Sequence, residues 1–223
     1  MTDVLPDESA RFVRAVGPQP DEILEEMDEY AEENGFPHVG PEVGGWLALL
    51  ARTVDARRVF EFGSGYGYSA YWFARELPAD GEVVLTEHDP DELEMAREYM
   101  DRGGVSDLAT YEEGDALAAI ERHEGPFDVV LVDLRKDQYP DAFDAVREKV
   151  APGGVIVADN AMTAGPIQFE KLLEFQEGGD PDDVNEHTRG IATYLDAVRA
   201  APEFETAVMP IGEGIAVSHK ERR

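Results

Sequence analysis

The stretch VFEFGSGYGYS, residues 59–69, joins an apolar strand to a glycine-rich turn and the first residues of a helix. Glycines in such a turn let the backbone approach a ligand closely and take positive φ angles. A dinucleotide-binding fingerprint, G-x-G-x-x-G, would place its third glycine at Tyr68, whereas this turn reads G-x-G-x-G and has an acid, Glu61, two residues before the first glycine. The segment therefore predicts the first strand–turn–helix unit of an α/β sheet. Its departure from the fingerprint favours a nucleotide-like ligand other than a nicotinamide or flavin cofactor.

Strands and helices alternate on the C-terminal side of this segment. Apolar runs predict strands at residues 57–62, 82–86, 109–112, 127–132 and 155–158. Helical periodicity predicts helices at residues 68–77, 90–102, 115–122 and 139–150, followed by a Pro-Gly-Gly turn at 152–154. Such alternation implies right-handed crossovers and a mostly parallel sheet covered by helices on both faces.

The two ends of the chain depart from this alternation. A short helix within residues 1–20 and helices at 21–33 and 41–53 precede the first strand, and helices at 166–176 and 189–200 follow the last parallel strand. Residues 204–209 and 215–219 read as two strands joined so tightly that they must be antiparallel, so the sheet ends in a hairpin. We expect one Rossmann-like α/β domain over residues 1–223, with a helical arm at 1–40 and a core at 41–220.

The charge of the chain is extreme. The 49 acidic residues outnumber the 19 basic ones, which gives a formal net charge of −30, and only four of the basic residues are lysines. The 43% of apolar residues and the clear periodicity argue against a disordered chain. An acid-rich, lysine-poor composition is typical of halophiles, where molar salt shortens the Debye length to about 3 Å and screens self-repulsion. We therefore expect a folded, halophilic protein.

Composition also limits the location and partners of the protein. The chain has no cysteine, so disulfides and thiolate chemistry are excluded. We find no secretory signal and no apolar run long enough to span a bilayer, which predicts a cytoplasmic protein without a membrane partner. The acidity disfavours a nucleic-acid partner, because binding to phosphates needs a basic surface.

Polar side chains follow two of the predicted buried strands. Asp133 and Lys136 come after residues 127–132, and Asp159 and Asn160 come after residues 155–158. Because ligands gather beyond the carboxyl ends of parallel strands, these side chains are expected to meet there. Two carboxylates and an amide suit a hard divalent cation, and the cation would lower the pKa of a substrate hydroxyl. The pattern predicts metal-assisted chemistry on an oxygen nucleophile, with Lys136 as a candidate base.

The same residues also have ordinary structural interpretations. Asp159 and Asn160 favour turns, and Asp133 could cap the helix that follows it. Lys136 could be a solvated surface lysine.

Acids also follow the second and third strands. Glu87 closes the strand at 82–86 and could accept the hydroxyls of a ribose. Asp115 and Ala116 follow Gly114 after the third strand and could border an adenine. With the glycine turn, these positions indicate a nucleoside-containing ligand that lies across successive strand ends.

Together these motifs resemble the cation-dependent O-methyltransferase family, which includes catechol and caffeoyl-CoA O-methyltransferases. The resemblance runs from about residue 39 to residue 220 and also covers the closing hairpin motif at 209–214. It rests on residues 61–69, Thr86-Glu87, Gly114-Asp115-Ala116, Asp133, Lys136, Tyr139, residues 152–154 and Ala158-Asp159-Asn160.

The resemblance implies S-adenosylmethionine as the methyl donor and Mg²⁺ or a similar cation as a second cofactor. It implies that Glu61, Gly63 and Ser69 border the methionine portion, Glu87 the ribose, and Asp115 and Ala116 the adenine. The remaining cofactor-binding residues implied are Gly65, Tyr66, Gly67 and Asp133. Asp133, Asp159 and Asn160 would bind the cation, Lys136 would be the catalytic base, and a homodimer is expected by analogy.

Three features leave the acceptor open. Arg135, immediately before the lysine, either suits a carboxylate- or phosphate-bearing acceptor or points outward to a surface acid. Residues 161–165 lack the aromatic that relatives carry there, and residues 177–187 read either as a lid or as a solvated loop. The expected function is O-methylation of a small, catechol-like acceptor with vicinal oxygens. Methylation of a hydroxylated uridine in tRNA and a non-catalytic nucleotide- or metal-binding module are the alternatives.

Overall fold

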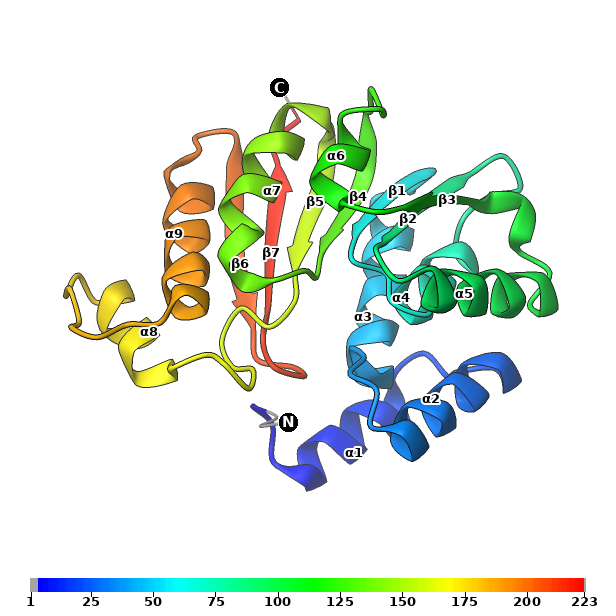
Figure 1. The fold of residues 1–223 in the computed structure, drawn as a ribbon, viewed down its shortest axis with the longest axis horizontal. Coiled ribbons are helices and arrows are strands. Elements are labelled where there is room, and N and C mark those ends of the chain that lie inside the picture. The colour runs from blue at the N-terminus through cyan, green and yellow to red at the C-terminus, as the bar shows by residue number, and fades with distance from the viewer. Residues whose placement is uncertain (1–3, 223) are drawn as a thin grey trace.

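The computed structural model describes residues 4–222, so the first three residues of the predicted arm and the last residue of the chain lie outside it. A seven-stranded sheet runs through these residues in the order β3-β2-β1-β4-β5-β7-β6 (Figure 1). The strands are β1 Arg58–Phe62, β2 Glu82–Glu87, β3 Ala109–Glu113, β4 Phe127–Val132, β5 Val150–Ala158, β6 Phe204–Met209 and β7 Ile215–Lys220. Strands β1 to β5 pair in parallel, and β7 pairs antiparallel with both β5 and β6. The predicted mostly parallel sheet with a closing hairpin is confirmed.

The helices follow the predicted order with small shifts at their ends. They are α1 Asp7–Val16, α2 Glu22–Asn34, α3 Gly40–Thr53, α4 Tyr68–Ala74, α5 Pro90–Arg102, α6 Ala116–Ile120, α7 Tyr139–Val146, α8 Phe169–Gln176 and α9 Glu186–Ala200. Short 3₁₀ turns are η1 Ser106–Leu108, η2 Lys136–Gln138 and η3 Arg147–Lys149. In the part of the chain that the structure describes, no helix is long and apolar enough to cross a membrane.

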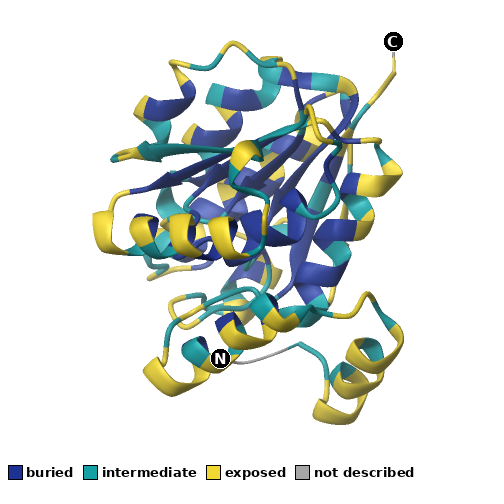
Figure 2. Cartoon of the chain, turned by 90° about the vertical axis from the view of Figure 1, so that its right-hand side faces the viewer, coloured by how far each residue is buried: buried dark blue, intermediate teal, exposed yellow. Residues whose placement is uncertain are grey.

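The apolar side chains of the parallel strands alternate between two cores, one on each face of the sheet. Alternation follows from the two-residue period of a strand, which points successive side chains to opposite faces. Helices α2 to α5 cover the first face and α6 to α9 the second, so the central strands β1, β2, β4 and β5 are buried between them (Figure 2). The first core takes Val59, Val83, Leu85, Val129, Leu131, Val155 and Val157, and the second takes Phe60, Phe62, Val84, Val130, Val132, Ile156 and Ala158.

The start of β5 differs from the prediction. The predicted helix at 139–150 ends at Val146, and the residues predicted as a Pro-Gly-Gly turn belong to β5. Val150 already pairs with Phe127, and the next pair along the two strands is Val155 with Val129, so the extra residues of β5 form an irregularity in the ladder. Gly153 accommodates it with a φ of 88°. The prediction of a turn at residues 152–154 is therefore wrong, because the pairing of Val150 with Phe127 makes these residues an irregular part of the strand.

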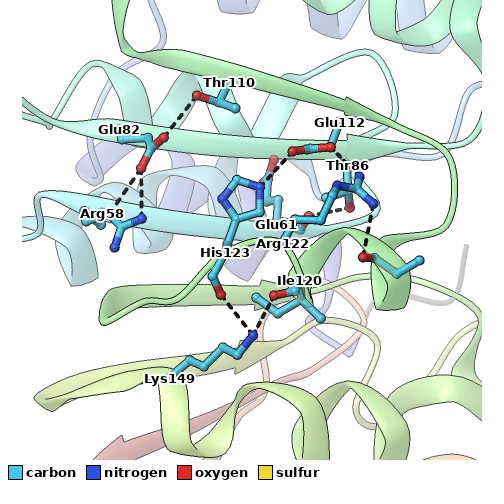
Figure 3. A network of polar contacts seen from close by, with 11 residues as sticks. Arg58, Glu61, Glu82, Thr86, Thr110, Glu112, Ile120, Arg122, His123 and Lys149 are labelled. Carbon is cyan, nitrogen blue, oxygen red and sulfur yellow. Dashed lines mark hydrogen bonds and ion pairs between the residues drawn. The ribbon is translucent and has the colours of Figure 1, made fainter.

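Each of the four lysines is half-buried and donates hydrogen bonds to two oxygen atoms. Lys149 Nζ lies 2.6 Å from the carbonyl of Ile120 and 2.9 Å from that of His123 and so closes the end of α6 (Figure 3). Lys220 bonds the carbonyls of Arg147 and Val150 and thereby fixes the start of β5. Lys149, Lys171 and Lys220 thus hold backbone segments together through carbonyl groups, a contact that suits a compact ammonium with three donors, whereas Lys136 bonds two side chains.

Candidate active site

Two cavities meet at the carboxyl ends of the parallel strands. The larger has a volume of about 570 Å³ and the smaller of about 380 Å³, and Gly63, Glu87 and Asp133 line both. The larger also contains Gly65, Tyr66, Ser69, Lys136, Asp159 and Asn160, and the smaller contains Asp115 and Ala116. The fold thus brings the residues predicted from separate motifs to one edge of the sheet.

The glycine turn fits tightly against the loop after β4. Gly63 has a φ of 82°, and a Cβ atom there would lie 2.1 Å from the Asp133 carbonyl oxygen. The Asp133 amide in turn donates to the Phe62 carbonyl at 2.9 Å. Gly67 begins α4 with a φ of 87°, and a Cβ there would lie 2.8 Å from that of Ala96. Both positions need glycine, for close approach as well as for backbone conformation.

Glu61 is fully buried at the end of β1, although it lines neither cavity. Among the described residues, no hydrogen bond meets either of its carboxylate oxygens. Burial raises the pKa of this carboxyl to about 8, the nearby Ser69 hydroxyl opposes that rise, and the charge of Asp133 adds to it. A buried acid of this kind, beneath the glycine turn, suits a cationic group of a ligand.

Glu87 is held by backbone amides at the end of β2. Its Oε2 accepts from Gly65 N at 2.9 Å, and its Oε1 accepts from His88 N at 2.7 Å and Asp89 N at 3.0 Å. The predicted acid therefore faces both cavities in a fixed orientation. Its Oε2, which has a single donor, can accept a further hydrogen bond from a ligand hydroxyl, whereas Oε1 is already occupied by the two amides and lies 2.6 Å from His88 Nδ1.

Asp115 and Tyr66 have structural roles as well as positions in the cavities. Asp115 caps α6 by accepting from Leu117 N at 2.7 Å and Ala118 N at 3.2 Å. The hydroxyl of Tyr66 donates to the Met27 carbonyl at 3.1 Å. The carboxylate of Asp115 is thereby directed to its own helix, and Tyr66 joins the cavity wall to α2.

Lys136 lies in η2 with its ammonium in the larger cavity. Its Nζ donates to Asp133 Oδ1 at 2.9 Å and to the hydroxyl of Tyr139 at 2.9 Å. Tyr139 is fully buried and donates to the Asp159 carbonyl at 2.9 Å, while burial raises its pKa well above the ordinary value. Lys136 is therefore neither a solvated lysine nor a mobile one. The sequence motif includes Tyr139, but the sequence alone predicts no role for it.

Asp159 and Asn160 follow β5 and face Asp133 across the cavity. Burial raises the pKa of the Asp159 carboxyl, Asp133 adds to the rise, and Lys136 opposes it. Asn160 Nδ2 donates to Glu213 Oε2 at 2.6 Å. Glu213 lines the cavity too, although the sequence predicts it only as part of the hairpin motif at residues 209–214 and not as a site residue.

The donor set fits a hard divalent cation. Two neighbouring carboxylates destabilise each other when both are ionised, a cation relieves that repulsion, and an amide oxygen is a suitable third ligand. Within residues 4–222, no group of three His, Asp or Glu side chains is placed to hold a metal ion, so a cation at this position would need Asn160 as a ligand besides the two carboxylates.

Two further predictions concerned the surroundings of the site. Arg135 is exposed and pairs with Asp137 at 3.0 Å and Glu186 at 3.6 Å, and it also lines the smaller cavity, so both interpretations of this residue remain open. Residues 177–187 do not line the larger cavity, so they form no lid in this structure. Phe36, Pro37, His38 and Val39, between α2 and α3, line it instead.

Comparisons with known proteins agree with this geometry. The family model described as O-methyltransferase matches residues 16–221. Catechol O-methyltransferase of Niastella koreensis is 33% identical over 165 residues, which cover 71% of this chain and 74% of that protein. Caffeoyl-CoA O-methyltransferase 1 of Eucalyptus globulus is 25% identical over 213 residues, or 92% of this chain and 85% of that protein.

A similar solved structure is that of the O-methyltransferase TomG from Streptomyces achromogenes in complex with SAM. It has a TM-score of 0.83 and 25% identity and covers 96% of each chain. The sheet topology and the site at its edge define a Rossmann-like methyltransferase. The chain belongs to the O-methyltransferase family.

Proposed function

We propose that this chain transfers the methyl group of S-adenosylmethionine to a hydroxyl of a small acceptor with vicinal oxygens. A divalent cation such as Mg²⁺ would be bound beside the acceptor, and Lys136 would be the base. The observation that carries the proposal is the meeting of Lys136, Asp133 and Asp159 in a cavity that the glycine turn also borders. SAM in the related TomG structure supports the same donor here.

The chain offers a binding surface for each part of the donor. Glu61 lines neither cavity, but its carboxyl lies buried beneath the glycine turn and would become the partner of the donor's ammonium group if the turn opens toward it. Glu87 suits the ribose hydroxyls, and Asp115 and Ala116 border the smaller cavity, where an adenine would lie. The methionine portion would lie along Ser69 and the glycine turn, where Gly65, Tyr66 and Asp133 line the cavity and Gly67 shapes the turn by its contact with Ala96.

The reaction needs a deprotonated oxygen in line with an activated methyl group. When bound, S-adenosylmethionine supplies that methyl group and the divalent cation lowers the pKa of a nearby hydroxyl. Asp133, Asp159 and Asn160 would hold the cation. Tyr139 keeps the Lys136 nitrogen in place, and Lys136 Nζ would take the proton of the acceptor hydroxyl.

The cavity supports a small acceptor over a nucleic acid. Its volume of about 570 Å³ suits one small molecule beside the donor. Its charged lining consists of Glu87, Glu92, Glu213, Asp133 and Asp159 with a single lysine, a composition that repels phosphates.

Methyl transfer by three proteins tests the proposal: wild type, Lys136→Met and a control, Lys171→Met, whose lysine lies on α8 away from the cavity. With labelled S-adenosylmethionine, Mg²⁺ and a panel of catechols, we expect kcat of Lys136→Met to fall by about 100-fold or more. The control should keep wild-type activity, and S-adenosylhomocysteine should bind all three within about threefold. Removal of the cation with EDTA should abolish turnover until Mg²⁺ is restored. Activity that survives EDTA, or that survives in Lys136→Met, would contradict the proposal.

A further inference from the structure

Glu213 reaches the cavity from the tip of the β6–β7 hairpin, 53 residues after Asn160. The backbone around it is joined to the loop after β5. Ala161 N donates to the Gly214 carbonyl at 2.7 Å, and Thr163 N donates to the Glu213 carbonyl at 2.8 Å. Gly214 lies so close to Met162 that a Cβ at 214 would be 2.5 Å from that side chain. The hairpin tip and residues 160–163 therefore form one packed unit.

The hydrogen bond between the two side chains fixes the orientation of the Asn160 amide. A carboxylate only accepts hydrogen bonds, and only the nitrogen end of an amide donates them. The 2.6 Å contact from Asn160 Nδ2 to Glu213 Oε2 therefore turns Oδ1 away from Glu213. Asn160 also has a φ of 51°, so its backbone is held in the left-handed region while the side chain is held by Glu213.

A negative charge at position 213 destabilises the site electrostatically, so the presence of an acid there calls for a functional reason. Glu213 is one of the charges that raise the pKa of Asp159, so it adds negative charge to a site that already contains two carboxylates. A glutamine could bond to Asn160 equally well in either amide orientation, because it both donates and accepts. A carboxylate permits one orientation only, and its bond is strengthened by its charge.

We infer that Glu213 is a positioning residue: its carboxylate sets the Asn160 amide so that Oδ1, and not Nδ2, is presented to the divalent cation. The inference rests on the proposed function. Glu213 would not touch the cation. It would act through Asn160, as outer groups commonly orient metal ligands.

An exchange of the two side chains tests this. Asn160→Asp places two carboxylates against each other, and Glu213→Gln removes the restriction on the amide. The double variant Asn160→Asp/Glu213→Gln restores one hydrogen bond with its polarity reversed, from the glutamine amide to the aspartate, and keeps the net charge of the wild type.

Cation affinity is the readout, by calorimetric titration of each protein with Mn²⁺ in high salt. We expect each single variant to bind about 10- to 100-fold more weakly and the double variant to recover to within about threefold of wild type. Melting temperatures and S-adenosylhomocysteine affinity, which should stay close to wild type, check the fold. If the double variant binds Mn²⁺ as weakly as the losses of affinity of the two single variants added together predict, the inference is overturned while the proposed function stands. A wild-type chain that binds no divalent cation would overturn both.

Discussion

Glu61 shows how one buried side chain makes the stability of the protein depend on pH. Its folded-state pKa of about 8 exceeds the ordinary carboxyl value of 4.5, so between these values the folded state binds more protons than the unfolded state. The free energy of unfolding should therefore fall as pH rises between these two values, by up to about 1.4 kcal/mol per pH unit.

Glu61→Gln should remove the contribution of Glu61 to the pH dependence of the unfolding free energy. The measurement is the melting temperature of the ligand-free protein between about pH 5 and about pH 8.5. We expect the melting temperature of the wild type to fall more steeply with pH than that of the variant. The variant should also bind S-adenosylhomocysteine more weakly at all pH values. Equal slopes for the two proteins would show that Glu61 is not protonated in the folded state.

At the same scale, the candidate site divides into residues that the sequence predicts and residues that it cannot predict. Asp133 and Lys136 are three positions apart, and Asp159 directly follows a recognisable strand, so local sequence is enough to find them. Glu213 meets Asn160 across 53 residues, and the Tyr139 hydroxyl meets the Asp159 carbonyl across 20. Such contacts depend on how the hairpin and η2 pack, which no local pattern specifies.

Among the elements, α9 supports the turn that carries Lys136. A Cβ at Gly190 would lie 2.2 Å from the Lys136 carbonyl oxygen and 2.7 Å from the Asp137 Cα, so η2 rests directly on the helix backbone. Glycine in mid-helix costs about 1 kcal/mol relative to alanine. The close contact accounts for its presence.

Gly190→Ala should therefore displace η2 in spite of the better helix propensity. We expect a loss of about 1–3 kcal/mol in unfolding free energy from overpacking and a kcat at least about tenfold lower. Thr193→Ala, on the exposed side of the same helix, is the matched control and should change stability by less than about 0.5 kcal/mol. Chemical denaturation and methyl-transfer kinetics measure both effects. Wild-type kcat in Gly190→Ala would show that η2 does not depend on this contact.

The elements themselves were largely predictable because strand and helix periods alternate clearly along residues 57–158. The exception, the start of β5, depends on the pairing of Val150 with Phe127. Hydrophobic periodicity predicts which segments are helices and strands, whereas the residue at which a strand begins depends on its pairing with the neighbouring strand.

For the molecule as a whole, charge should dominate the response to salt. With a formal net charge of −30, self-repulsion opposes folding in dilute buffer, and salt at about 1 M shortens the Debye length to about 3 Å. We expect the melting temperature to rise between about 0.1 M and about 2 M KCl. Sucrose at matched osmolality is the uncharged control, which separates the screening of charge by KCl from its osmotic effect. A melting temperature that falls or stays level with KCl would contradict the expectation.

The four lysines, each bonded to two oxygens, have a practical consequence. An amine-reactive label needs a nitrogen that is sterically accessible, and these side chains become accessible only after their hydrogen bonds open. Labelling rates at Lys149 and Lys220 would thus follow the opening of the sheet at the start of β5, and the labelling rate at Lys136 would follow the opening of η2. The scarcity of lysine turns each one into a separate reporter of local unfolding.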